Sequence, residues 1–289
     1  MDENNTPPSS AAANPALEVD LDKVIRDKSP RLARLLPRFV ISWLKRTIHQ
    51  DQVNHVLRNF GHLEPLEFVR ATLDYMDIRY RAVGLENVPP EGRYFFVSNH
   101  PFGGLDGLML VEELNARFGP TKVIVNDLLM HLRPLAPLFI PVNKHGRQKA
   151  DYARIFREEL MSPDHIASFP AGICSRRSGG VVCDKPWHAS FVKNAIESRR
   201  DVVPVFFEGR LSNFFYNLAS LRTRLGIKTN LEMLFLVDEM FSQEGQSFSI
   251  VFGKPVPWQE MAAEGTPARW AERIRGMAYA LEKNIPQDA

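Results

Sequence analysis

The chain contains very little cysteine. Cys174 and Cys183 are the only two among 289 residues, and no group of cysteines and histidines has the spacing of zinc ligands. So few thiols in a chain of this length exclude a small disulfide-stabilised scaffold and favour a reducing compartment. We therefore expect no disulfide framework, no metal ion and no bound cofactor.

Long hydrophobic runs are missing as well. No apolar stretch approaches the roughly 20 residues that span a bilayer. Residues 1–16 are polar and rich in proline and alanine, which predicts a disordered tail, and they lack the charged start and apolar core of a secretion signal. If this protein meets a membrane, we expect it to lie on the surface rather than to cross it.

Acidic residues are absent between Lys28 and Arg46, a segment with six basic residues. The net charge of +2 does not predict nucleic-acid binding, so the position of these basic residues matters more than their number. Residues 37–49 form a predicted helix with apolar residues at helical spacing, which suits either a membrane interface or packing on the protein's own domain. The side chains expected at a membrane are Arg34, Arg38, Phe39, Trp43, Leu44, Lys45 and Arg46.

Beyond residue 76, segments with the pattern of strands alternate with segments that have the pattern of helices. This alternation predicts an α/β fold with a mixed, largely parallel sheet flanked by helices. The expected regions are a tail at 1–16, an N-terminal amphipathic helical region at 17–76 that faces the membrane, and an α/β domain at 77–289. The predicted strands are 78–83, 93–98, 121–126, 165–169, 202–207 and 248–252, and the helices between and after them are 106–117, 147–160, 188–199, 211–225 and one beginning at Thr266-Pro267.

The loop at 98–106 follows a predicted buried strand and carries His100 and Asp106. A histidine accepts a proton near neutral pH because its ordinary pKa is about 6.5, and a carboxylate on its other ring nitrogen fixes the tautomer. Gly103 and Gly104 would let the loop fold back so that the two side chains meet. The simpler alternative is a histidine next to a helix that Asp106 caps.

Two further loops follow predicted strands and hold candidate binding groups. In the loop 139–147, Lys144 and Arg147 could hold an anion, although a solvated turn is the commoner structure. In the loop 169–177, the main-chain amides could bind an oxyanion. Cys174 in that loop could be a nucleophile, but a buried cysteine more often serves as a small apolar residue.

Together, these segments resemble the PlsC-type glycerolipid acyltransferase family. The first block, Asn-His-x4-Asp, matches Asn99, His100 and Asp106 with one residue more between the histidine and the aspartate. Phe139-Ile140 match the second block. The third block and the Val-Pro-Val block match Phe169-Pro170, Gly172 and Ser175, and Val203-Pro204-Val205. The resemblance covers about residues 75–260 and makes 77–289 the acyltransferase domain.

The departures from the family pattern point to one branch. The glutamate of the third block is replaced by Ala171 and its arginine by Cys174, which argues against a glycerol-phosphate acceptor. The Asn-His-Pro-x-Gly and Phe-Pro-Ala-Gly forms resemble the hemolysin-like branch, which includes O-acyltransferases of ornithine and glycine lipids.

The resemblance implies an acyl transfer from an acyl-carrier-protein or CoA thioester to the hydroxyl of a lyso-lipid, most closely an amino-acid lipid. His100 would be the general base and Asp106 its partner, on the cytoplasmic face of the inner membrane. The alternatives are a lysophospholipid or 1-acyl-glycerol-3-phosphate acyltransferase, a thioesterase, and a non-catalytic, hemolysin-like membrane-binding protein. The implied substrate-binding residues are Asn99, Gly103, Gly104, Phe139, Lys144, Arg147, Gly172, Ser175 and Arg176.

Overall fold

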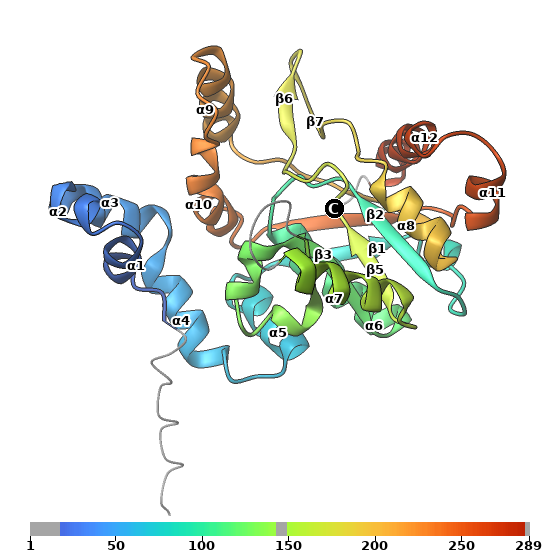
Figure 1. Cartoon of the computed structure of the whole chain (residues 1–289), viewed down its shortest axis with the longest axis horizontal. Helices are drawn as coiled ribbons and strands as arrows, with labels where there is room; N and C mark the ends of the chain where they lie inside the picture. Colours follow the sequence, from blue (N-terminus) through green and yellow to red (C-terminus); the bar gives the residue numbers. More distant parts are fainter. Residues whose placement is uncertain (1–17, 143–148, 287–289) are drawn as a thin grey trace, which may run out of the picture. The chain divides into compact units, whose positions relative to one another are not determined.

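The computed structural model describes residues 18–142 and 149–286 (Figure 1). The chain divides into two compact units, Met1–His62 and Leu63–Ala289. Among the described residues, no helix is both long and apolar enough to cross a bilayer.

The first unit is helical. Asp20 caps α1 by accepting a hydrogen bond from the amide of Lys23, and α2 begins at Pro30, a residue whose fixed φ suits the first position of a helix. The side-chain amide of Asn54 exchanges two hydrogen bonds with the main chain of Val19, which fixes the start of the unit to its last helix. The helices are α1 (Leu21–Lys28), α2 (Pro30–Leu35), α3 (Arg38–Thr47) and α4 (Gln50–Phe60).

The second unit is built on a seven-stranded sheet with the strand order β1-β9-β8-β2-β5-β3-β4. All neighbouring strands are parallel except β8 and β9, so the sheet is mixed and mostly parallel. The predicted α/β class is therefore confirmed. The strands are β1 (Arg79–Val83), β2 (Tyr94–Ser98), β3 (Thr121–Asn126), β4 (Phe139–Val142), β5 (His165–Ser168), β8 (Asp201–Phe207) and β9 (Ser247–Phe252).

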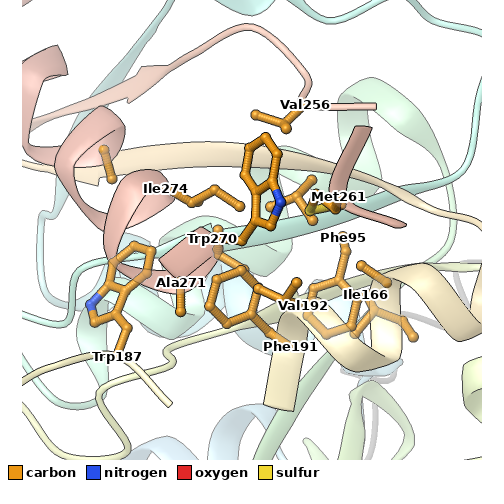
Figure 2. Close-up of a cluster of buried hydrophobic side chains, with 14 of the residues drawn as sticks. Phe95, Ile166, Trp187, Phe191, Val192, Val256, Met261, Trp270, Ala271 and Ile274 are labelled. Carbon is orange, nitrogen blue, oxygen red and sulfur yellow. The ribbon is translucent and has the colours of Figure 1, made fainter. Parts of the chain in front are cut away.

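Helices cover both faces of this sheet. Successive side chains of β2 point to opposite faces, so they show what packs on each one. Phe95 and Val97 lie in a core with side chains from four helices, and Figure 2 shows Trp270, Ile274 and Val192 gathered in this cluster. These helices are α7 (Lys149–Met161), α8 (Ser190–Ser198), α11 (Trp258–Ala263) and α12 (Pro267–Ala280).

On the other face, Phe96 contacts Phe118 at the end of α6 (Leu105–Phe118), with ring centroids 5.3 Å apart. The helix α5 (Pro65–Tyr75) packs on α6. The division between the units falls before α5, whereas the boundary predicted from the sequence lies after it, at residue 77.

The connection from β8 to β9 is the longest between strands of the sheet, and the sequence predicts only part of its helical structure. It contains α9 (Asn213–Arg224), which the sequence predicts, and then the 3₁₀ helix η5 (Leu231–Phe235) and α10 (Leu236–Phe241), which it does not. A second unpredicted feature is the antiparallel hairpin of β6 (Arg176–Ser178) and β7 (Val181–Cys183). Strands of three residues are too short to show a recognisable alternation of polar and apolar side chains.

Pro204 lies in β8, an interior strand, although a proline usually marks an edge or a bulge. Its carbonyl accepts a hydrogen bond from Gly253, just beyond the end of β9. The missing amide of Pro204 faces this same side, since both polar groups of a strand residue point the same way. Regular pairing with β9 ends at Phe252 and resumes at a single antiparallel bridge between Val202 and Val256, with one residue more on the side of Val256. The proline therefore lies at a bulge in the pairing of β8.

Candidate active site

His100 and Asp106 meet at the carboxyl end of β2. The distance from His100 Nδ1 to Asp106 Oδ2 is 2.9 Å, and the Asp106 side chain is fully buried while that of His100 is 16% exposed. The same carboxylate accepts hydrogen bonds from the amides of Phe102 and Gly107. Both of these amides are donors, so the Asp106 carboxylate also acts as an acceptor toward Nδ1 of His100. In this tautomer Nδ1 carries the proton, and the lone pair of Nε2 is available to accept another proton.

Gly103 and Gly104 form the bend that brings the pair together. Gly103 has φ +75°, a conformation that residues with a Cβ rarely adopt, and Gly104 is the residue before the first turn of α6. A Cβ on Gly103 would lie 3.0 Å from a methyl of Leu236 and 3.3 Å from the Cβ of Cys174. The extra residue between His100 and Asp106 is thus accommodated in the bend without loss of their hydrogen bond.

Phe169 fixes the plane of the histidine ring. The two rings stack with centroids 4.1 Å apart and an angle of 24° between planes. Phe169 follows directly after β5, the strand beside β2. The first and third blocks therefore meet because the carboxyl ends of two neighbouring parallel strands lie at the same edge of the sheet.

Asn99 joins the ends of β2 and β8. Its amide nitrogen donates to the carbonyl of Phe207 at 2.9 Å, and its oxygen accepts from the amide of Phe207 at 2.7 Å. Both polar groups of this side chain are therefore bound to main chain, which positions the residue before His100.

A buried aspartate, Asp184, ties the third loop to the first. Its carboxylate accepts hydrogen bonds from the hydroxyl of Ser175 at 2.6 Å, from the indole of Trp187 at 2.9 Å and from the amide of His100 at 3.3 Å. The amide of Ser175 also donates to the carbonyl of His100. Burial raises the pKa of the Asp184 carboxyl, and the hydrogen bonds from Ser175 and Trp187 act in the opposite direction.

Arg176 is the centre of a second buried network. Its guanidinium donates to the carbonyl and the sulfur of Cys174 and pairs with Glu232 at 3.1 Å. Arg222 binds the other side of the same fully buried carboxylate at 2.8 Å. Cys174 is 1% exposed and burial raises the pKa of its thiol, which fits the structural role of a small apolar residue better than that of a nucleophile.

The remaining predicted binding residues lie in other places. Gly172 has φ +69° and its amide closes the turn after β5 onto the carbonyl of Phe169. Phe139 begins β4, three strands from β2, so the structure does not bring it to His100. Lys144 and Arg147 lie outside the described residues.

In the first unit, the predicted membrane-facing side chains fall into two groups. Phe39 and Trp43 are 73% and 43% exposed, and Arg34, Arg38 and Arg46 are exposed as well. Leu44 and Lys45 are half-buried, and the ammonium of Lys45 pairs with Asp22 of α1.

Three residues of the site have no individual role in the prediction from the sequence: Asp184, Phe169 and Glu232. A signal existed for Asp184, since it is the single acidic residue between His165 and Ile196. Phe169 was recognised only as a member of the third block, and nothing in the sequence pairs Glu232 with Arg176, 56 positions away.

A histidine held by a buried carboxylate, at the carboxyl edge of a mostly parallel sheet, is an arrangement that can take a proton from a hydroxyl group or water. Comparison with known proteins narrows the range of reactions. Residues 23–288 match the model of a family described as "Acyltransferase". The chain belongs to this acyltransferase family and is therefore an enzyme that transfers acyl groups.

Two curated relatives match this chain over nearly their whole lengths. The lyso-glycine lipid O-acyltransferase of Bacteroides thetaiotaomicron is 45% identical over 264 residues, which are 91% of this chain and 97% of that protein. The lyso-glycine lipid O-acyltransferase of Phocaeicola vulgatus is 44% identical over 91% of this chain and 95% of its own length. The resemblance to the amino-acid-lipid branch of PlsC-like acyltransferases is thereby confirmed.

Among solved structures, the chain is similar to the 1-acyl-sn-glycerophosphate (LPA) acyltransferase PlsC from Thermotoga maritima. The sequence identity is 14% and the TM-score 0.49, over 85% of this chain and 88% of that one.

Proposed function

We propose that this enzyme transfers a fatty acyl group from an acyl thioester to the hydroxyl of a lyso-amino-acid lipid, with lyso-glycine lipid as the first acceptor to test. The observation that carries the proposal is the hydrogen bond between His100 and the buried Asp106. The choice of acceptor is supported by the two curated relatives, which are named lyso-glycine lipid O-acyltransferases, are 44% and 45% identical, and match over nearly their full lengths.

In this mechanism Nε2 of His100 takes the proton of the acceptor hydroxyl, while the oxygen of that hydroxyl attacks the carbonyl carbon of the thioester. The tetrahedral intermediate then collapses, the carbon–sulfur bond breaks, and the thiolate leaves with a proton from the imidazolium. The products are an ester and a free thiol. Asp106 keeps Nδ1 protonated and stabilises the imidazolium, a role that typically contributes a factor of about 10² to 10⁴ in rate together with the base.

The acyl donor in this proposal is a thioester of acyl-carrier protein or of CoA, both of which carry acyl groups in the cytoplasm. We accordingly place the enzyme at the cytoplasmic face of the inner membrane, attached peripherally through its first unit. The exposed Phe39 and Trp43, with Arg38 and Arg46 nearby, have the composition of an interfacial helix.

The test is an acyl-transfer assay with purified enzyme, in which lyso-glycine lipid and lysophosphatidic acid compete as acceptors and acyl-ACP and acyl-CoA are offered in turn. Mass spectrometry of the lipids should show the acylated glycine lipid as the main product, and His100→Ala should remove it. A preference for lysophosphatidic acid would contradict the proposed acceptor.

The same assay without an acceptor tests the hydrolytic alternative. Release of free fatty acid at a rate equal to that of transfer would assign the pair to a thioesterase. Vesicle leakage without any turnover, unchanged in His100→Ala, would instead support a non-catalytic membrane-binding protein.

A further inference from the structure

The helix α9 presents apolar side chains on two faces. Phe215 and Tyr216 are buried against the second unit, as expected for one face of a surface helix. Phe214, Leu221 and Leu225 are nevertheless 54%, 54% and 65% exposed. Their spacings of seven and four residues place them on one stripe of the helix that the fold itself does not cover.

The segment after α9 extends this stripe. In η5, which packs on α9, Leu231, Met233 and Leu234 are exposed while Glu232 between them is buried. In Figure 1, α9 and α10 form a helical projection beside the hairpin of β6 and β7. We call this region the α9–η5 surface, and its exposed apolar residues are Phe214, Leu221, Leu225, Ile227, Leu231, Met233 and Leu234.

Positive charge surrounds the α9–η5 surface. Between Gly209 and Val237 the sequence has four basic residues and one acidic residue, Glu232. Arg176 and Arg222 hold that carboxylate, which is fully buried. Arg210, Arg224 and Lys228 are exposed, so this segment presents cations and apolar groups to solvent but no exposed carboxylate.

We infer that the α9–η5 surface docks onto a bilayer that contains anionic lipids. Apolar side chains among basic ones match the composition of interfacial membrane-binding segments, whose apolar groups enter the headgroup boundary while the cations bind lipid phosphates. The inference goes beyond the proposed function, which places the membrane contact in the first unit. It adds an independent contact in the unit that holds His100.

The position of this surface gives the docking a purpose. Leu236 follows η5 directly. A methyl group of Leu236 lies against the loop of His100, since a Cβ added to Gly103 would be 3.0 Å from this methyl. The same segment is fixed to the third loop by the pair of Glu232 and Arg176. Docking therefore holds the bilayer next to the loop of His100, from which a lipid acceptor can enter without crossing water.

The first test follows the environment of residue 225 in the full chain. A Leu225→Cys variant, made with Cys183→Ser so that the buried Cys174 is the other thiol, is labelled with a polarity-sensitive fluorophore. Vesicles of phosphatidylcholine with phosphatidylglycerol should shift the emission to the blue. A label at Met161→Cys, an exposed position at the end of α7, should not respond.

The second test measures binding to the same vesicles by sedimentation. Replacing Leu221, Leu225 and Leu234 by serine should weaken binding at least about tenfold. The matched control replaces three exposed apolar residues elsewhere, Leu129, Leu132 and Met161, and should bind like the wild type. Both triple variants should keep the wild-type melting temperature and the activity on detergent-dispersed acceptor.

The results can contradict the inference in three ways. Unchanged vesicle binding of the α9–η5 variant, with binding lost only in a Phe39→Ser, Trp43→Ser variant, would assign the whole attachment to the first unit. A label at residue 225 that is blue-shifted before vesicles are added would show that protein covers the surface. Equal binding to vesicles without phosphatidylglycerol would remove the anionic specificity.

Discussion

The hydroxyl of Ser175 donates a hydrogen bond of 2.6 Å to the carboxylate of Asp184, and both residues are buried. Through this bond the loop after β5 is held against the loop of His100, whose amide uses the same carboxylate oxygen. The position of His100 therefore depends on Ser175, a residue that touches neither the imidazole nor Asp106.

The bond between Ser175 and Asp184 predicts a measurable coupling. Ser175→Ala should lower the free energy of unfolding by about 1.5–3 kcal/mol, the range for hydrogen bonds to charged groups. The double variant with Asp184→Asn should lose less than the sum of the single losses, because both changes remove the same bond. Urea denaturation measures all three values.

The control for this cycle is Ser178→Ala, which alters an exposed serine in the neighbouring hairpin and should leave stability unchanged within about 0.5 kcal/mol. Strict additivity of the Ser175 and Asp184 effects would show that their contact contributes no energy.

Asp106→Asn should reduce acyl transfer by a factor of about 10² to 10⁴ while leaving the fold intact. An asparagine amide can donate to Nδ1 of His100 and so favours the tautomer in which Nε2 carries the proton and cannot accept one. The measurement is the turnover number with saturating acceptor, together with the melting temperature. A turnover within a factor of about two of the wild type would exclude His100 as a base that depends on this carboxylate.

Glu232→Gln should lower the free energy of unfolding by about 3–5 kcal/mol, because it leaves Arg176 and Arg222 without the charge that neutralises them in a largely buried site. The matched control is Glu244→Gln, an exposed position in the same connection. Urea denaturation of both variants measures their free energies of unfolding. Equal values would contradict the prediction, because they would mean that the charge of Glu232 beside Arg176 and Arg222 does not stabilise the fold.

Stability should fall as the pH is lowered through 6.5, and His165 should contribute to this fall. Burial lowers the pKa of His165 below its ordinary value of 6.5, so the unfolded chain binds a proton at a pH where the folded chain does not. The neutral ring suits its contacts, since Nδ1 accepts from the amide of Tyr94 and Nε2 faces the carbonyl of Phe118.

His165→Gln should therefore show a flatter dependence of unfolding free energy on pH below 6.5, at a lower overall stability. The exposed His62 provides the control, and His62→Gln should keep the slope of the wild type. A slope unchanged in His165→Gln would mean that other groups carry the proton uptake.

The sequence by itself predicted six of the seven strands of the sheet, all but β4, and the pair of His100 and Asp106. Apolar strands such as 94–98 and 201–207 stand out because their residues are buried on both faces, and the capped helix at Thr266-Pro267 carries local signals that act over a few residues. The pattern of four ordered blocks identified the family, and it included His100 and Asp106.

Only the tertiary structure decided how the loops are joined. Asp184 supports His100 from 84 positions away, and Glu232 holds Arg176 across 56 positions, because strand order and crossovers bring these segments to one edge of the sheet. A sequence pattern records neighbours along the chain, whereas a buried carboxylate finds its donors in space. The apolar stripe of α9 shows the same limit, since spacing alone cannot tell a face that is covered from one that is left exposed.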